Sequence, residues 1–260
     1  MIQGQRFQKI EEMANERGIV NTREMAEILG VTETTIRRDY EELEKLGKIV
    51  RVHGGARSLK KRHIVTMGDE LEIEKRTAHA REKDAVCKKA ASFVEDGACV
   101  FLDGGSSIVP MVKYLKNRRV KIVTNSLLAA NAFHSGEAEV FVIGGSYIPK
   151  YGMSIGPLSI EALSKFNFDY AFISCIGVDL DRKLIYTAEI ETMAVKDAVM
   201  KLSSTNILLL DSSKLYLKAF CSLVPLTSFD IAICNNDISI NPEDLPGNFI
   251  LVDVDKPEES

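Results

Sequence analysis

The chain has 260 residues, of which 45% are hydrophobic and 27% are charged, a balance that suits two unequal folded domains and argues against overall disorder. No apolar run approaches the ~20 residues that span a bilayer, and the charged, amphipathic N-terminus is unlike a signal peptide, so we expect a cytoplasmic protein without a membrane partner. The net charge is −4, but residues 1–62 alone carry +3, from 13 Lys and Arg against 10 Asp and Glu, so only this part favours a polyanionic partner.

The first predicted element is an amphipathic N-terminal helix, and a helix-turn-helix follows it at about residues 20–39. Phe7, Ile10 and Met13 of the first helix are expected to pack against the helix-turn-helix. Thr22 is a candidate N-cap, because its hydroxyl can accept a hydrogen bond from a free backbone N–H. Gly30 can adopt the positive φ that ends a helix. The apolar face of the helix between them comprises Met25, Ala26, Ile28 and Leu29.

The second helix of the motif has two different sides. Thr32 is its candidate N-cap, and the spacing of Ile36, Tyr40 and Leu43 places them on one buried side, with Leu46 near its edge. The other side is polar, and it is expected to lie in the DNA major groove. Its residues, with those of the flanks, are Thr34, Thr35, Arg37, Arg38 and Lys45.

A basic hairpin is predicted after Gly47, which ends the second helix. Arginine can read guanine through two hydrogen bonds, and threonine offers a hydroxyl and a methyl to base edges, whereas cations on a hairpin neutralise phosphates. Each feature alone suits a solvated surface, but their occurrence together favours double-stranded DNA as the partner. The predicted DNA-contacting residues are Thr22, Thr32, Thr34, Thr35, Arg37, Arg38, Lys48, Arg51 and His53, and Arg57 adds a further charge to the hairpin.

This stretch resembles the N-terminal signature of the DeoR family of bacterial transcriptional regulators. The resemblance rests on Arg37-Arg38-Asp39 and on His53-Gly54-Gly55-Ala56, while Tyr40 stands where the family usually has Leu. It implies a winged helix-turn-helix, followed by a domain that senses a sugar phosphate, and it implies repression of transcription.

Beyond the hairpin, residues 59–75 lose periodicity and are predicted to be a linker, with an extended segment at 64–67, between a DNA-binding domain at 1–58 and a second domain at 76–260. In the second domain, short apolar runs alternate with helical patterns, which predicts an α/β fold with a mostly parallel sheet covered on both faces. The predicted helices are 79–95, 108–117, 127–134, 158–166 and 189–203. The predicted strands are 99–103, 120–124, 139–144, 170–175, 206–211, 230–234 and 249–253.

Small and polar residues follow five of these strands. Ligands of parallel sheets bind at the carboxyl ends of strands, where glycines let backbone N–H groups approach an anion and lysines add charge. Single turns of this kind are ordinary, but five on one edge predict a site for a phosphorylated sugar or a related effector. The candidate residues are Asp103, Gly104, Gly105, Ser106, Ser107, Thr124, Asn125, Ser126, Gly144, Gly145, Asp179, Lys196 and Lys214.

The family resemblance extends over this domain and implies the fold of ribose-phosphate isomerases and CoA transferases, used as a sensor. Two departures bear on which effector fits. The loop 103–107 reads Asp-Gly-Gly-Ser-Ser where the family commonly has Asp-Ser-Gly-Thr-Thr, and Lys183 stands where Gly is common.

Other chemistry finds less support in the sequence. The five cysteines lack metal or disulfide spacing and are expected to be buried thiols, and no metal site or cofactor is predicted. Residues 152–156 match Gly-x-Ser-x-Gly, but without the strand and helix that a nucleophile elbow needs, so a loop is expected there.

The leading hypothesis is a repressor of a carbohydrate-metabolism operon that acts as a homodimer or larger oligomer, because helix-turn-helix proteins read repeated half-sites. The rival is a sugar-phosphate isomerase-like enzyme with a DNA-targeting head, with Glu189 or Asp179 as the base and Lys196 as the electrophile. A third possibility is a DNA-binding structural protein whose second domain only oligomerises.

Overall fold

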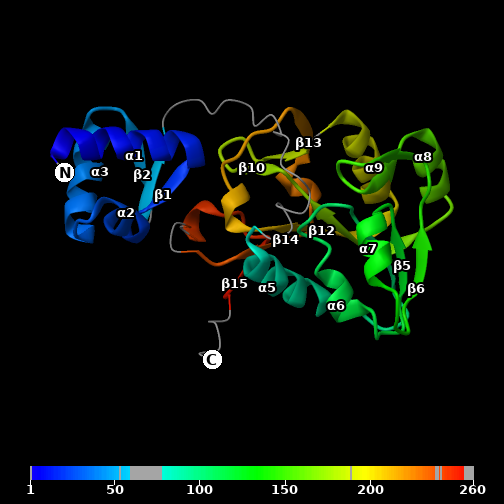
Figure 1. Cartoon of the computed structure of the whole chain (residues 1–260). Coiled ribbons are helices and arrows are strands. Elements are labelled where there is room, and N and C mark those ends of the chain that lie inside the picture. The colour runs from blue at the N-terminus through cyan, green and yellow to red at the C-terminus, as the bar shows by residue number, and fades with distance from the viewer. Residues whose placement is uncertain are drawn as a thin grey trace. The chain divides into compact units, whose positions relative to one another are not determined.

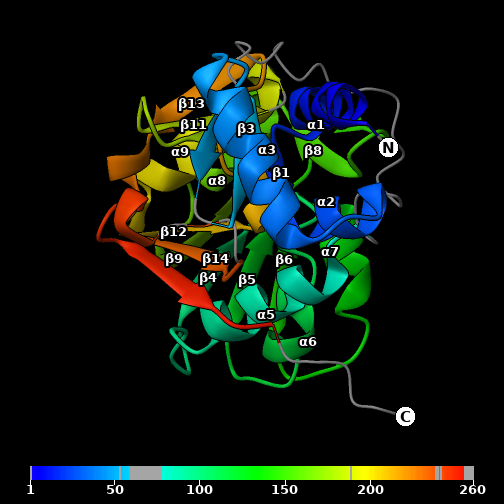
Figure 2. The same cartoon turned by 90° about the vertical axis from the view of Figure 1, so that its left-hand side faces the viewer.

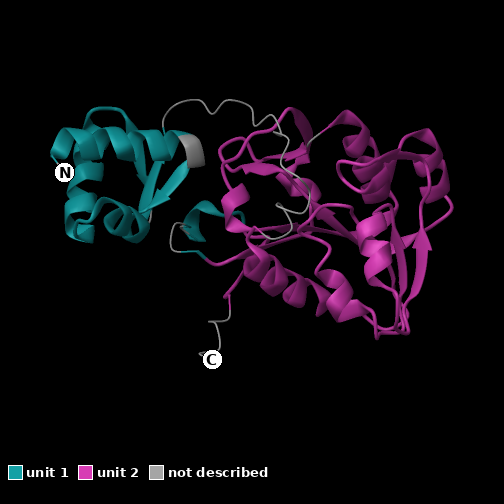
Figure 3. Ribbon diagram, viewed as in Figure 1, with its two compact units in different colours: residues 1–65, 237–246 teal, residues 66–236, 247–260 magenta. Residues whose placement is uncertain are grey.

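The computed structural model describes residues 2–52, 54–58, 78–187, 189–237, 240 and 242–254, without the side chains of Glu16 and Arg17. The chain forms two compact units, one of residues 1–65 with 237–246 and one of residues 66–236 with 247–260 (Figure 3). The domain limits 1–58 and 76–260 stay predictions. The predicted linker at 59–75, its extended segment at 64–67 and His53 lie outside the described residues.

The N-terminal unit contains a three-helix, three-stranded winged helix-turn-helix (Figure 1). Its strands are antiparallel in the order β1-β3-β2, and β2 and β3 form the wing. The elements are α1 (Gln3–Arg17), β1 (Ile19–Asn21), α2 (Thr22–Leu29), α3 (Glu33–Lys45), β2 (Ile49–Val52) and β3 (Gly55–Ser58).

The core of this unit follows the predicted periodicity, with one correction. Ile10 and Met13 of α1 are buried and Phe7 packs against them. Ile28 was expected on the buried face of α2, but 47% of it is exposed. The α2 residues that face the core are Thr22, Met25, Ala26 and Leu29, and Ile28 lies at the flank of this stripe.

Of the two predicted N-caps of the helix-turn-helix, the structure confirms one and corrects the other. Thr32 caps α3 as predicted, because its hydroxyl accepts a hydrogen bond from the Thr35 N–H at 3.3 Å. The prediction for Thr22 is wrong, since Asn21 caps α2 by accepting from the N–H groups of Arg23 and Glu24. Gly30 ends α2 with φ 64°, as expected. Asn and Thr are both good N-caps, so the sequence placed the helix start one residue late.

Tyr40 is buried in this core with 2% of its surface exposed, and its hydroxyl has no hydrogen-bond partner among the described residues. Burial raises the pKa of this phenol above its ordinary value. A buried hydroxyl without a partner costs stability, so replacing Tyr40 with Phe should increase the free energy of unfolding by about 1 kcal/mol. Urea unfolding of the two proteins checks this, and a less stable Phe variant would show that the hydroxyl does find a partner.

The second unit is built on a seven-stranded sheet that is parallel throughout, in the order β15-β14-β12-β9-β4-β5-β6. All seven predicted strands form this sheet, which confirms the predicted α/β class. The strands are β4 (Cys99–Leu102), β5 (Lys121–Thr124), β6 (Glu139–Val142), β9 (Phe168–Ser174), β12 (Ser203–Leu210), β14 (Ile231–Asn235) and β15 (Phe249–Val252).

Helices cover both faces of this sheet. On one face, Leu102 and Phe172 share a core with the neighbouring helices α5 and α6. The alternate residues Phe101 and Ile173 are equally buried, and α9 contacts β9 and β12, with α8 beside it (Figures 1 and 2). The helices are α5 (Ala80–Ala91), α6 (Met111–Leu115), α7 (Leu127–Ala132), α8 (Pro157–Leu163) and α9 (Ile190–Lys201), so the helix predicted at 108–117 is shorter than expected.

Two small antiparallel sheets were not predicted. One pairs β7 (Ser146–Ile148) with β8 (Met153–Ile155), and the other joins β10 (Gly177–Asp179), β11 (Leu184–Thr187) and β13 (Cys221–Pro225). The loop expected at 152–156 is therefore largely a strand, and Ser154 is buried within it and does not lie on a nucleophile elbow.

The five cysteines are free thiols, as predicted, and all except the half-buried Cys99 are buried. Among the described residues, no cluster of three or more His, Cys, Asp or Glu side chains could hold a metal ion. In the same residues, no helix is both long enough and apolar enough to cross a membrane.

Candidate DNA-binding surface and sensor site

The outward side of α3 carries the predicted base-reading residues. Thr34 and Arg38 are exposed one helical turn apart. Arg37 is also exposed, but its guanidinium lies 3.2 Å from the Glu33 carboxylate. Arg38 makes no ion pair or hydrogen bond within the part of the chain that the structure describes, so its guanidinium is available to a partner.

Thr22 and Thr35 differ from this pattern. The side chain of Thr22 is buried, with 5% of the residue exposed, so it is a poor candidate for a DNA contact. The Thr35 hydroxyl lies 3.0 Å from the Thr32 hydroxyl, at the N-terminus of α3. Thr32 and Thr35 therefore shape the start of α3 and stay predicted DNA contacts.

Asp39, which follows the two arginines, makes a structural contact that the sequence did not indicate. It is 2% exposed and accepts two hydrogen bonds from the Arg6 guanidinium, at 2.6 and 2.9 Å. This bidentate ion pair joins α1 to α3 and fixes the helix that presents Arg37 and Arg38.

Two of the predicted phosphate contacts at the wing, Lys48 and Arg51, form ion pairs within the unit. Lys48 lies 3.5 Å from Glu11 of α1. Arg51 lies 2.9 Å from both Glu41 and Glu44 of α3. Lys48 and Arg51 are thus paired with carboxylates of the same unit, and both stay predicted DNA contacts.

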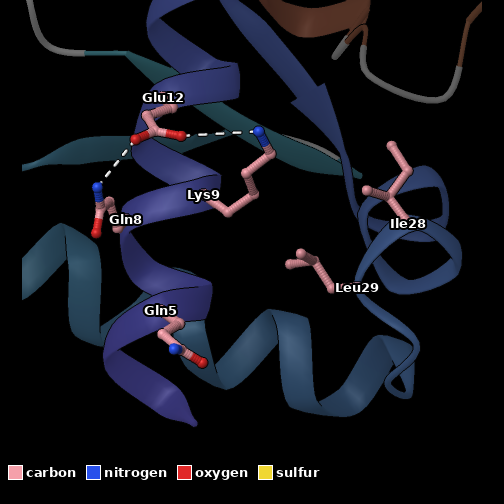
Figure 4. A pocket seen from close by; sticks show the side chains of 6 residues that line it. All are labelled: Gln5, Gln8, Lys9, Glu12, Ile28 and Leu29. Carbon is pink, nitrogen blue, oxygen red and sulfur yellow. Dashed lines mark hydrogen bonds and ion pairs between the residues drawn. The ribbon is translucent and has the colours of Figure 1, made fainter. Parts of the chain in front are cut away.

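A groove of about 260 Å³ lies between α1 and α2 of this unit (Figure 4). None of its residues belongs to the predicted DNA-contacting set. It is lined by Gln5, Gln8, Lys9, Glu12, Ile28 and Leu29.

In the second unit, Asp103 after β4, Ser174 at the end of β9 and Lys196 of α9 form a buried network. Lys196 Nζ lies 2.8 Å from Asp103 Oδ2 and donates to the Ser174 carbonyl at 2.7 Å. The Ser174 N–H donates to the same Asp103 oxygen at 2.9 Å, and the Ser174 hydroxyl donates to that oxygen as well. Burial opposes ionisation of Asp103, but the charge and hydrogen bonds of Lys196, with those of Ser174, outweigh it, and the pKa of Asp103 lies below its ordinary value.

Two further lysines reach the loop that follows Asp103. Lys214 donates to the Ser107 hydroxyl at 2.6 Å, and Lys83 donates to the Ser106 hydroxyl at 3.4 Å. Lysines from α5, α9 and the turn after β12 therefore converge on the loop 103–107. This is an arrangement of ammonium groups and hydroxyls that can hold an anion.

A second carboxylate, Asp211, balances part of this charge. Asp211 is 1% exposed. Burial raises its pKa, but Lys214, a hydrogen bond from Ser213, and the nearby His79 and Lys83 together hold the pKa below its ordinary value. Asp211 therefore stays ionised beside the lysines.

The polar residues after β5 are mostly satisfied inside the fold. Thr124 donates to the Leu102 carbonyl at 2.7 Å, and Ser126 caps α7. Asn125 donates to the Ser154 carbonyl at 2.8 Å, and its Oδ1 has no partner among the described residues. Thr124 and Ser126 position the strand end, and Asn125 holds a free acceptor.

The remaining predicted residues make their contacts elsewhere in the second unit, away from the lysine cluster. The Gly144 carbonyl accepts from Ser159, and a methyl at Gly145 would lie 2.5 Å from the Ile155 carbonyl oxygen. Asp179 belongs to β10 of a separate sheet and pairs with Lys218 at 2.9 Å. Glu189, the other base of the rival enzyme, accepts from the Tyr151 hydroxyl at 2.8 Å.

Sequence reasoning left Lys83, Ser174 and Asp211 out of the site. Lys83 shares a helix face with Val86, Cys87 and Ala90, which are buried, and a lysine on an apolar face is a usable signal. Ser174 carried no comparable signal, because only the fold brings it to Asp103.

Gly105 allows the network to form. A methyl group at Gly105 would lie 2.6 Å from the Ser174 Cβ, so replacing Gly105 with Ala should displace Ser174 and lower the free energy of unfolding by about 1–3 kcal/mol. Gly144→Ala is the matched control, because a methyl there meets nothing within 4 Å. Chemical denaturation of both variants checks the difference, and equal stabilities would contradict the close approach.

A winged helix-turn-helix joined to an α/β unit with a lysine-lined loop is the architecture of a DNA-binding regulator with a sensor domain. Residues 6–62 match the DeoR-like helix-turn-helix domain, and residues 78–236 match the DeoR C-terminal sensor domain. The chain belongs to the DeoR family of transcriptional regulators.

Full-length relatives agree with this assignment. The chain is 32% identical over 243 residues to the HTH-type transcriptional regulator YulB of Bacillus subtilis, covering 93% of this chain and 92% of YulB. It is 30% identical to the lactose phosphotransferase system repressor of Staphylococcus epidermidis, over 89% of this chain and 92% of the repressor. Ribose 5-phosphate isomerase A of Methanocaldococcus jannaschii shares 18% identity with a TM-score of 0.40, over 53% of this chain and 55% of the isomerase. A likeness of this last degree carries no information on activity.

Proposed function

We propose that the protein represses a set of carbohydrate-metabolism genes, and that a phosphorylated sugar or related metabolite changes its DNA affinity by binding in the second unit. Repression and the carbohydrate connection are suggested by the relatives that are named lactose phosphotransferase system repressors. Its place is then the cytoplasm, where bacterial DNA lies.

One observation carries the proposed effector class: Lys83, Lys196 and Lys214 come from three separate elements and meet on the loop 103–107. Ammonium groups in a largely buried setting bind a phosphate more strongly than they would in water. Ser106 and Ser107 offer hydroxyls to the same ligand, and Asn125 Oδ1 offers an acceptor for a sugar hydroxyl.

The effector acts through its preference for one arrangement of the protein. A ligand shifts DNA affinity only when it binds the DNA-competent and the released states with different affinities. We propose a homodimer or larger oligomer, because helix-turn-helix proteins bind two half-sites. In such an assembly the ligand would change the spacing of the two DNA-binding units.

The test is ligand binding, measured by calorimetry with inorganic phosphate and with a panel of hexose and pentose phosphates, each beside its unphosphorylated sugar. A sugar phosphate should bind and the free sugar should not. Lys214→Met should weaken binding by about tenfold or more, because it removes a charged hydrogen-bond donor. Lys113→Met is the matched control, since Lys113 pairs with Asp84 on the surface. Equal binding by both variants would remove Lys214 from the site.

Measurements of DNA release and of ligand turnover separate the proposal from its rivals. Release of DNA by a sugar phosphate that is recovered unchanged supports a sensor and not an enzyme. Conversion of the sugar phosphate by the purified protein would favour the isomerase-like alternative. A protein that binds DNA but no phosphorylated metabolite would support the structural alternative.

A further inference from the structure

The alternation of side chains along the wing strand β2 places Arg51 on the face that packs on the helices. Side chains alternate between the two faces of a strand. Ile49 is fully buried against the helices, so Arg51, two residues later, belongs to the same face. Arg51 is therefore directed toward α3, whereas Val50 and Val52 belong to the other face.

Glu44 holds both the backbone and the side chain of Arg51. One Glu44 carboxylate oxygen accepts from the Arg51 backbone N–H at 2.8 Å, and the other accepts from Arg51 Nε at 2.9 Å. Glu41 accepts from the guanidinium at 2.9 Å. The backbone hydrogen bond from Arg51, followed by its side-chain hydrogen bond and charge, holds the pKa of Glu44 below its ordinary value despite slight burial.

The wing is fixed at other points as well. Lys48, which precedes β2, pairs with Glu11 of α1 at 3.5 Å. Gly55 of β3 lies so close to Val20 of β1 that an added methyl would collide with the Val20 carbonyl. The Arg51 contacts thus complete a wing whose base is already held, and they tie its outer strand to the helix that carries Arg38.

We propose that Glu44, assisted by Glu41, positions the wing for DNA through Arg51, and that Arg51 is a positioning residue and not a phosphate contact. The inference rests on the proposed DNA-binding function of this unit. It replaces the expectation from sequence that Arg51 neutralises a phosphate.

The positioning role of Glu44 and simple charge repulsion predict opposite changes in DNA affinity when Glu44 is removed. A carboxylate near DNA repels phosphates, so removal of Glu44 should strengthen DNA binding if only its charge matters. If Glu44 positions the wing, its removal should weaken DNA binding. Glu42 provides the matched control, because it carries the same charge on the same helix and pairs with Lys45 at 2.8 Å, with no bond to any wing residue that the structure describes.

The experiment uses the full chain and a DNA duplex selected from a random-sequence library by the wild-type protein, with affinity measured over a range of salt concentrations. Glu44→Ala should weaken binding by about threefold to tenfold, as expected for loss of a coupled contact. Glu42→Ala should bind as tightly as wild type or more tightly. Glu44→Gln keeps an oxygen for the Arg51 N–H and should retain most of the affinity.

Arg51→Ala keeps its backbone N–H bond to Glu44, so it should lose some affinity but no more than Glu44→Ala, with an unchanged salt slope. The double variant should lose no more than Glu44→Ala alone. A salt slope reduced by about 1 for Arg51→Ala would show a phosphate contact and overturn the proposal. Equal DNA affinities of the Glu44→Ala and Glu42→Ala variants would also overturn the proposal. Exposed ion pairs contribute little to stability, so equal melting temperatures should show that the variants are folded. A wild-type protein that selects no duplex would instead refute the proposed function.

Discussion

Replacing Lys196 with Met is expected to remove about 3–5 kcal/mol from the free energy of unfolding, because it leaves the Asp103 carboxylate buried without its cation. Lys196 and Asp103 are 5% and 1% exposed, and their charged atoms lie 2.8 Å apart. A loss of this size is a large share of the stability of an ordinary domain. Urea unfolding, followed by circular dichroism, measures it.

The matched control for this variant lies on the same helix. Lys201 pairs with Asp197 one turn apart, and its side chain is 72% exposed, so Lys201→Met should change stability by no more than about 0.5 kcal/mol. Combining Lys196→Met with Asp103→Asn should recover part of the loss, since no buried charge is then left alone. A double variant as unstable as Lys196→Met would contradict this reasoning.

The pH dependence of stability should reverse between the two proteins. In the wild type the pKa of Asp103 is lowered, so the stabilisation is present above the unfolded value of about 3.9 and is lost as the pH falls through the folded pKa. Without Lys196, burial should raise the pKa of Asp103, so the variant should lose stability as the pH rises from about 4. The difference between the proteins should therefore be larger at neutral pH than in acid.

Replacing Arg38 with Ala should weaken binding to a cognate duplex by about 1–3 kcal/mol, which is roughly 5-fold to 150-fold, if its guanidinium contacts a guanine. Arg38 is exposed one turn from Thr34, and within the described residues it has no competing ion pair. The duplex selected by the wild-type protein and a scrambled duplex, compared in gel-shift titrations, measure the loss of affinity and of discrimination.

Lys45→Ala is the control for Arg38→Ala. Lys45 lies on the same helix, near its C-terminal end, and pairs with Glu42. Its removal should change binding to both duplexes by a similar small factor, because a lysine that pairs with a carboxylate and contacts at most phosphates reads no sequence. If Arg38→Ala also weakens both duplexes equally, Arg38 contacts a phosphate and not a base.

The parallel sheet was predictable because its strands are buried on both faces and therefore appear in the sequence as continuous apolar runs. NILLLD and DIAIC, at 206–211 and 230–234, carry this signal and form β12 and β14. The three-residue strands β7, β8 and β10 are too short for alternation to show, and β10 contains Gly177 and Asp179, which are typical of turns.

The sites were predictable only in part. Loop 103–107 and Lys214 were found because they follow strands, and Lys196 was expected to add positive charge. The structure brings the three together. Ser174 joins them through the pairing of β9 with β4, which no local pattern reveals. Arg51 looked like a free cation in the sequence, since its pairing with Glu44 depends on how β2 packs on α3.

The sequence positions of residues that pack together determine when the winged helix-turn-helix and the parallel sheet can form during synthesis. All buried residues of the winged helix-turn-helix core lie between Ile10 and Ala56, so this core is complete once residue 56 has been made. Strand β4 must wait for β9, as in the pairing of Val100 with Tyr170, and the lysine cluster is incomplete until residue 214. Because domains fold as units from the N-terminus, a growing chain can hold a folded winged helix-turn-helix well before the lysine cluster has formed. The winged helix-turn-helix can therefore fold while the later strands of the sheet are still being made.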